Sequence, residues 1–264
     1  MMNLAHIAPW LQKTGAYGPV TATLDWCEVN HQFSPYIAEM ANTFSNLFTV
    51  GISLVGYLEA VRQGLPSRYS SGYTGVALVG IGSFFFHATL LFQAQLADEL
   101  PMIYVASMSL FLLWDSQPGF GLKKLRTKFL IVLLVLFDIL FTWSYMVYRN
   151  PIYHQVIFAF LVISTAFRIT YILKLTNARV RIPEQKKGRS SDFSAPALPL
   201  GWPAAFLLEG HSWWHVFTGL GTYYMFIGIQ RTTLSTKDDP KSYDVYYRFG
   251  LPHVSKNTEK ARIS

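Results

Sequence analysis

Long apolar segments alternate with short polar connectors over most of the chain. Six segments have the length of about 20 mostly apolar residues that one membrane-spanning helix needs, and they lie at 37–61, 71–92, 98–116, 129–148, 151–173 and 211–230. Some connectors are as short as the pair Arg149 and Asn150. This pattern predicts an all-α fold, a polytopic transmembrane helix bundle in which six apolar spans are visible.

The same pattern divides the chain into three regions. Residues 1–36 form an N-terminal segment, residues 37–230 form the transmembrane domain, and residues 231–264 form a polar tail that we expect to be loosely ordered. Inside the transmembrane domain, the connector 175–205 is basic and carries four prolines, so it does not read as a span. Its prolines are Pro183, Pro196, Pro199 and Pro203.

Composition strengthens the membrane interpretation. Hydrophobic residues make up 51% of the chain and charged residues 14%, against roughly 25% charged in a typical soluble domain. This excludes a disordered chain and a collagen-like chain, and the single cysteine, Cys27, excludes an intrachain disulfide. The first thirty residues lack the apolar core of a cleavable signal peptide.

The distribution of basic residues predicts the orientation. The net charge of +7 comes mainly from connectors and the tail, so membrane topology explains it better than a nucleic-acid partner does. Connectors one and three are basic and should face the cytosol, which places the N-terminus in the lumen or outside. The fifth connector and the tail are both basic too, yet six spans would put them on opposite sides. The pattern therefore predicts that one crossing is missing between 175 and 210.

Three histidines are candidate metal ligands. His211 and His215 are four residues apart and share one helix face, while His87 ends the second span. Three imidazoles with an open fourth position are the ligand set of a catalytic zinc site. Ser83 lies one helical turn before His87, and its hydroxyl could stabilise an oxyanion. Asp98 lies at the start of the third span, and its carboxylate could accept a proton. A lone histidine at a helix end is more often a packing residue, but the cost of ionisable groups in a membrane favours function here.

A second candidate site lies before the first span. Closely spaced oxygens suit calcium, although the spacing does not match an EF-hand loop, and a solvated acidic face is the plainer interpretation. The residues concerned are Asp25, Trp26, Glu28, Asn30 and Glu39.

Other polar residues receive simpler interpretations. We expect His154, which follows Pro151 at a span start, to be structural, and His6, His31 and His253 to be solvated. Asp138 lies in the middle of a span and is assigned no role.

Several blocks together resemble the alkaline ceramidases, a family of seven-span intramembrane zinc hydrolases. Especially specific are the Asp-Glu-Leu-Pro-Met run and the Trp-Trp pair between the histidines. The blocks are Gly18-Pro19, Thr23 to Glu28, Ala38-Glu39 with Asn42 to Asn46, Gly82-Ser83 with His87, Asp98 to Tyr104, Pro151 to Val156, and His211 to Gly221.

The resemblance implies hydrolysis of the ceramide amide bond to a sphingoid base and a fatty acid, in the endoplasmic reticulum or Golgi membrane. It implies that His87, His211 and His215 bind zinc, that Asp98 activates the zinc water and that Ser83 holds the oxyanion. It also implies that Asp25, the Trp26 carbonyl, Glu28, Asn30 and Glu39 bind calcium. The substrate would be ceramide within the bilayer, with membrane lipids around it. The stretch 200–210 is similar to fungal members, which favours phytoceramide or dihydroceramide.

One departure from the family leaves alternatives open. Members carry a further span with a Trp-Asn-x-Asp-Asn signature, and the connector 175–205 stands in its place. If this connector stayed in the cytosol, His211 and His87 would lie on opposite sides of a hydrocarbon core about 30 Å thick and could not share a metal. The chain would then be a catalytically inactive truncated or splice-variant product. A receptor-like zinc membrane protein related to the adiponectin and progestin receptors is the other alternative.

Overall fold

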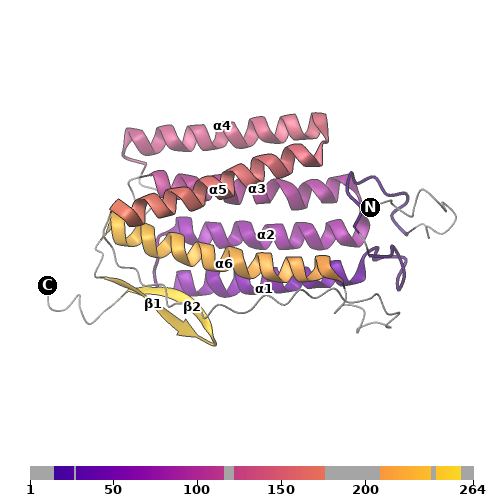
Figure 1. Ribbon diagram of the computed structural model, residues 1–264, viewed down its shortest axis with the longest axis horizontal. Coiled ribbons are helices and arrows are strands. Elements are labelled where there is room, and N and C mark those ends of the chain that lie inside the picture. The colour runs from indigo at the N-terminus through magenta and orange to yellow at the C-terminus, as the bar shows by residue number, and fades with distance from the viewer. Residues whose placement is uncertain (1–14, 27, 116–121, 176–208, 239–241, 257–264) are drawn as a thin grey trace.

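A computed structural model describes residues 15–26, 28–115, 122–175, 209–238 and 242–256. In these ranges the backbone forms six helices followed by an antiparallel hairpin (Figure 1). The helices are α1 (Met40–Arg62), α2 (Ser67–Thr89), α3 (Phe92–Trp114), α4 (Leu125–Tyr148), α5 (Pro151–Leu175) and α6 (Gly210–Lys237). The hairpin pairs β1 (Tyr243–Arg248) with β2 (Leu251–Lys256).

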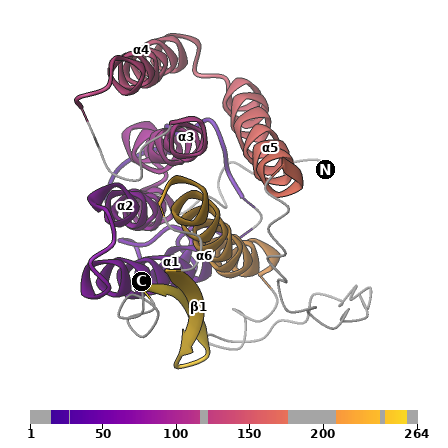
Figure 2. The ribbon, with the colours of Figure 1, turned by 90° about the vertical axis from the view of Figure 1, so that its left-hand side faces the viewer.

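The helices form the expected polytopic bundle. Four of them are long and apolar enough to cross a membrane, namely α1, α3, α4 and α5 over Pro151–Ile172. The helices α2 and α6 are as long, but they carry the polar side chains of the site described below. Seen end-on, α1, α2, α3 and α6 cluster together, and α4 and α5 lie on one side of them (Figure 2). Large apolar side chains such as Phe160 and Trp143 point outward from α5 and α4, as lipid contact requires.

Contacts at the two ends of the bundle fix the helix directions. The start of α5 meets the start of α3, where His154 lies 2.9 Å from the Glu99 carbonyl oxygen. The end of α5 meets the end of α3, where the Arg168 guanidinium lies over the Trp114 ring. The end of α6 also reaches the end of α3, through a hydrogen bond from Lys237. Consequently α1, α3, α5 and α6 run in one direction, and α5 and α6 are parallel although they follow one another among the described helices (Figure 1).

The connector 175–205, expected to replace a span, lies outside the described residues except for Leu175. Because α5 and α6 are parallel, α6 begins at the end of the bundle at which α5 began. The histidine pair therefore starts α6 at the same end of the bundle at which His87 finishes α2. A cytosolic connector would place His87 and His211 on opposite sides of the membrane. In the structure they lie at the same end of the bundle.

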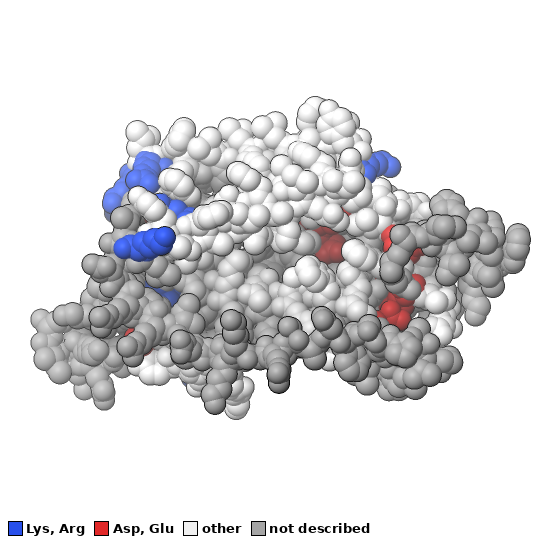
Figure 3. All heavy atoms as spheres, viewed as in Figure 1, with Lys and Arg blue, Asp and Glu red and all other residues white. Residues whose placement is uncertain are grey.

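Charge is distributed unevenly between the two ends. Arg62, the last residue of α1, and Lys123 and Lys124, which precede α4, lie at one end of the bundle. Figure 3 shows most of the visible basic side chains at that end and most of the acidic ones toward the other. Inside the basic end, a buried ion pair joins Arg68 to Asp115 at 3.1 Å. Thr127 donates to the same carboxylate at 2.8 Å, so the starts of α2 and α4 are tied to the end of α3.

Small residues let the central helices approach closely. A Cβ atom at Gly72 of α2 would lie 2.2 Å from the Phe226 ring of α6, and one at Gly56 of α1 would lie 2.3 Å from the Tyr73 ring of α2. Larger residues there would push the helices apart. These contacts hold α1, α2 and α6 together, which are the helices that carry the site.

The structure corrects the expectation of a loosely ordered tail. The helix α6 continues to Lys237, and side-chain contacts join the hairpin to α1 and α6. Tyr223 donates to the Pro252 carbonyl at 2.7 Å, and Arg248 pairs with Glu59 at 3.0 Å. The short strands also add a small β element to the predicted all-α bundle.

Two of the histidines expected to be solvated are buried instead. His253 lies on β2, and His31 lies in the N-terminal segment, where its backbone N–H donates to the Ala38 carbonyl. His6 lies outside the described residues. His154 is buried and bonded to the α3 backbone, in agreement with a structural role.

Candidate metal centre

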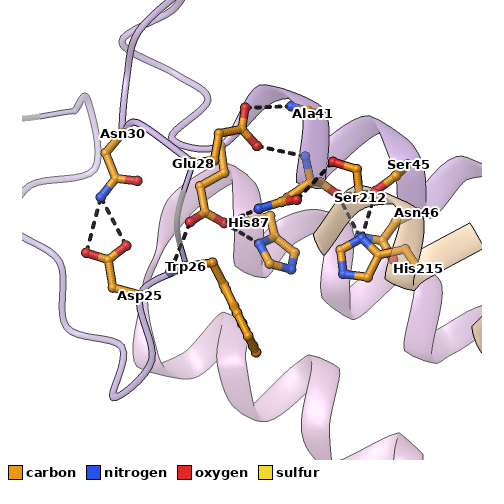
Figure 4. Close-up of polar contacts among 12 residues, drawn as sticks. Asp25, Trp26, Glu28, Asn30, Ala41, Ser45, Asn46, His87, Ser212 and His215 are labelled. Atoms are coloured by element: carbon orange, nitrogen blue, oxygen red, sulfur yellow. Dashed lines mark hydrogen bonds and ion pairs between the residues drawn. The ribbon is translucent and has the colours of Figure 1, made fainter. Parts of the chain in front are cut away.

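The three candidate zinc ligands meet at one end of the bundle. His87 lies two residues before the end of α2, and His211 and His215 occupy the first two turns of α6. One ligand atom from each lies within 4.8 Å of the others, and in the described part of the chain this is the only such group of three or more histidine, cysteine, aspartate or glutamate residues. His87 and His215 are buried, and their ring centroids lie 4.8 Å apart (Figure 4).

The hydrogen bonds of His215 select one tautomer. The Ser45 hydroxyl of α1 donates to the Asn42 carbonyl at 2.8 Å, so its oxygen accepts from Nδ1 of His215, 2.7 Å away. With the proton on Nδ1, the Nε2 atom keeps the lone pair that a metal needs. The amide nitrogen of Asn46 lies 3.2 Å from the same Nδ1. It donates to the Asn42 carbonyl oxygen and so does not compete for this nitrogen.

A carboxylate fixes His87 in the same way. The Nδ1 atom of His87 donates to the Glu39 carboxylate at the start of α1, in a buried contact. Asn42 donates to the same Glu39 oxygen at 3.2 Å, and the Trp26 backbone N–H donates to its other oxygen at 3.3 Å. A carboxylate behind a metal-binding histidine is a common arrangement because it orients the ring and raises its basicity. Nε2 of His87 is therefore also left with its lone pair.

The third histidine is held by stacking. The His211 ring lies against the Trp26 indole with ring centroids 3.8 Å apart and planes 16° apart. This contact joins α6 to the N-terminal segment. Three neutral imidazoles from two helices, two of them with a fixed tautomer, are a donor set that fits zinc.

The proposed acid–base residues face each other beside the histidines. Ser83 is buried one turn before His87, and its hydroxyl is within hydrogen-bonding reach of the Asp98 carboxyl group on α3. The close approach depends on Gly82, where a Cβ atom would lie 1.9 Å from the Ala97 carbonyl oxygen. Pro101, inside α3, has no N–H to pair with that carbonyl. The local sequence thus brings the two helix backbones together where Ser83 and Asp98 meet.

The five residues expected to bind calcium lie in one region but do not converge on one point. Asp25 accepts from the Asn30 amide at 3.3 Å, and Glu28 accepts from the backbone N–H groups of Ala41 and Asn42 at 2.8 and 2.9 Å. Glu39 accepts a hydrogen bond from His87. Among these five residues, the side-chain oxygen of Asn30 and the indole N–H of Trp26 are buried without a hydrogen-bond partner, and only the oxygen could bind a cation. Calcium binding would therefore require these side chains to exchange partners.

A further carboxylate lies near this region. Burial raises the pKa of Glu209, and the charges of Glu28 and Glu39 raise it further. Burial also raises the pKa of Glu28, although the backbone N–H groups of Ala41 and Asn42 act in the opposite direction. Glu28 and Glu39 are buried, so a solvated acidic face does not describe them.

Sequence reasoning missed the residues that support the ligands. The sequence places Asn42 and Ser45 in a matching block without a role, and it assigns Glu39 to calcium. The available signal was their position: Glu39, Asn42 and Ser45 are spaced three apart, which places them along one face of a helix start. Nothing in the sequence indicated that this face meets the histidines.

Comparisons with known proteins match most of the chain. A model of the family described as Ceramidase matches residues 18–195 and 194–255. Alkaline ceramidase 3 of Mus musculus is 30% identical, with 93% of this chain and 96% of the relative covered. Alkaline ceramidase YPC1 of Saccharomyces cerevisiae is 28% identical, covering 89% and 84%, and the alkaline ceramidase of Arabidopsis thaliana is 26% identical, covering 78% and 82%.

Proposed function

Because the chain belongs to the ceramidase family, we propose that it hydrolyses the amide bond of ceramide at a zinc ion held by His87, His211 and His215. The products are a sphingoid base and a free fatty acid. When bound by three imidazoles with an open fourth position, zinc supplies Lewis acidity and a nucleophile at neutral pH. The observation that carries the proposal is the meeting of the three imidazoles, with Nε2 of His87 and of His215 left available.

Two side chains beside the histidines take the remaining roles. The Asp98 carboxylate acts as general base: it accepts a proton from the attacking water and then gives this proton to the nitrogen of the leaving amine. The Ser83 hydroxyl donates a hydrogen bond to the oxygen of the scissile carbonyl as negative charge develops on it. Their mutual contact holds both groups on the α2–α3 side of the centre.

The N-terminal segment is proposed to bind calcium through Asp25, the Trp26 carbonyl, Glu28, Asn30 and Glu39. The unpartnered oxygen of Asn30 and the density of carboxylates support this. Two members of this set contact proposed zinc ligands. Glu39 accepts a hydrogen bond from His87, and Trp26 stacks on His211. Calcium bound here would therefore influence the metal centre.

Substrate preference and location are proposed from the resemblance. The stretch 200–210 favours phytoceramide or dihydroceramide, although it lies mostly outside the described residues. The chain is a multi-pass membrane protein, and we place it in the endoplasmic reticulum or Golgi membrane.

The test is to purify the full chain in nanodiscs and to measure zinc per chain and sphingoid base released from ceramide and phytoceramide. His215→Ala should lose zinc and turnover together. His253→Gln, at a buried histidine far from the centre, is the matched control and should keep both. A zinc-loaded wild-type chain without turnover would favour the receptor-like alternative, and a chain without zinc or turnover would favour the inactive product.

A further inference from the structure

Several residues of the matching blocks take no part in the proposed chemistry, yet they meet at one place. Thr23 precedes the calcium candidates, Glu99 follows Asp98, and His154 begins α5. The structure brings all three to the first turns of α3, where Gln95 and Tyr145 join them.

Glu99 is the centre of this group. Its side chain is buried, and its carboxylate accepts from the Tyr145 hydroxyl at the end of α4. The Gln95 amide, one turn earlier on α3, donates to the same carboxylate at 3.2 Å. A buried carboxylate is costly unless hydrogen bonds satisfy it, so these partners hold Glu99 in one arrangement.

The network continues into two more segments. The Thr23 backbone N–H donates to the Gln95 side-chain oxygen at 2.8 Å, and the Gln95 amide donates to the Thr23 hydroxyl at 2.8 Å. Nε2 of His154 donates to the Glu99 carbonyl oxygen at 2.9 Å. The N-terminal segment, α3, the end of α4 and the start of α5 are thus tied together through Glu99 and Gln95.

The position of Glu99 links this network to the proposed base. Consecutive residues of an α-helix point about 100° apart around its axis. Asp98 faces Ser83 on α2, whereas Glu99 faces α4 and the start of α5. A rotation of α3 that released Glu99 would therefore turn Asp98 away from Ser83.

We propose that Glu99 is a positioning residue for the hydrolysis: by anchoring the first turns of α3 to Tyr145 and, through Gln95, to Thr23, it sets the rotation that presents Asp98 to the substrate amide. This inference rests on the proposed function, in which Asp98 is the base. It also gives a physical reason for the Asp-Glu pair, because one carboxylate acts on the substrate and its neighbour fixes the helix.

Zinc content distinguishes a positioning role of Glu99 from a general role in folding. All three proposed zinc ligands lie on α2 and α6, and none lies on α3. Loss of the anchor should misplace Asp98 without removing zinc. A displacement of about 1 Å at a catalytic group costs on the order of 100-fold in rate.

The experiment compares Glu99→Ala, Glu99→Gln and Tyr145→Phe with the wild-type chain in nanodiscs, measuring zinc content, kcat and KM for ceramide. We expect Glu99→Ala to lower kcat about 10- to 100-fold with zinc content and KM close to wild type. Glu99→Gln keeps a side chain that can accept from Tyr145 and should restore part of the rate, and Tyr145→Phe should give a smaller loss. Ser107→Ala is the matched control, because Ser107 also joins α3 to α4, at Asp138, but two turns further on.

The outcomes separate the two proposals. Full kcat in Glu99→Ala, or an equal loss in Ser107→Ala, overturns the positioning role. Loss of zinc in parallel with kcat in both Glu99→Ala and Tyr145→Phe also overturns it, since the network would then only hold the fold. If the wild-type chain has no turnover, the proposed function fails. Amide hydrogen exchange of residues 95–99 then tests whether Glu99 anchors α3. If it does, exchange there is faster in Glu99→Ala than in Ser107→Ala.

Discussion

The Glu39 carboxylate accepts a hydrogen bond from Nδ1 of His87. A residue expected to bind calcium therefore contacts a residue expected to bind zinc. The contact is buried, so solvent does not weaken it. The two proposed metal sites share a side chain, and a change at one should be measurable at the other.

Replacing Glu39 tests this link directly. In Glu39→Ala, His87 loses the acceptor that holds its tautomer, and zinc affinity should fall about 10- to 100-fold. Zinc competition with a chelator measures the change. Asp25→Asn is the matched control, since Asp25 belongs to the calcium candidates but bonds to Asn30. Equal zinc affinity in both variants would contradict the link.

Ser45 should support zinc through His215. Ser45→Ala removes the acceptor at Nδ1, so the ring can turn or change tautomer, and zinc affinity should fall by about tenfold. Ser53→Ala, two turns further along α1, removes a hydroxyl that bonds only within its own helix, to Thr49. That control should bind zinc like the wild type. A loss in both variants would point to a general weakening of α1.

Gly82 should matter for rate more than for metal. In Gly82→Ala the new Cβ meets the Ala97 carbonyl oxygen, and the helices must separate at a cost of about 1–3 kcal/mol. The separation moves Asp98 from Ser83, so turnover should fall while zinc remains bound. Gly51→Ala on α1, where a Cβ would meet nothing within 4 Å, is the control for thermal unfolding and turnover.

Removing the proposed base or the proposed oxyanion donor should separate chemistry from metal binding. Asp98→Asn should lower kcat about 10²- to 10⁴-fold and Ser83→Ala about 10²- to 10³-fold, both with zinc retained. Steady-state kinetics with a parallel zinc assay checks this. Zinc loss in Asp98→Asn would instead make Asp98 a part of the ligand shell.

The two ends of the chain should lie on opposite sides of the membrane. The N-terminal segment packs at the histidine end of the bundle, whereas the hairpin packs at the basic end. Glycosylation tags before Met1 and after Ser264, expressed in microsomes, should therefore be modified only at the N-terminus, because the basic end is expected in the cytosol. Modification at both ends, or at neither, would contradict the parallel arrangement of α5 and α6.

The sequence was sufficient for the bundle and for the histidine pair. Apolar segments of membrane-spanning length predicted the helices, and the spacing of His211 and His215 placed both on one face. The basic connectors predicted that one crossing is missing between 175 and 210. The parallel course of α5 and α6 places the same gap between these two helices.

Other features depend on contacts that no local pattern carries. The ordered hairpin arises because Tyr243 and Val254 are buried against helices far away in the sequence. His253 is buried by the same packing. The link between Glu99, Tyr145 and Thr23 joins residues separated by up to 122 positions (145 minus 23), so only the folded bundle brings them together.

The parallel course of α5 and α6 sets a lower limit on the length of chain between them. The 25 residues of α5 span about 38 Å, and the chain has to cover a comparable distance to reach Gly210. Even fully extended, at roughly 3.3–3.6 Å per residue, this takes about 11 residues. A deletion that leaves fewer residues than this between Leu175 and Gly210 should pull His211 and His215 away from His87.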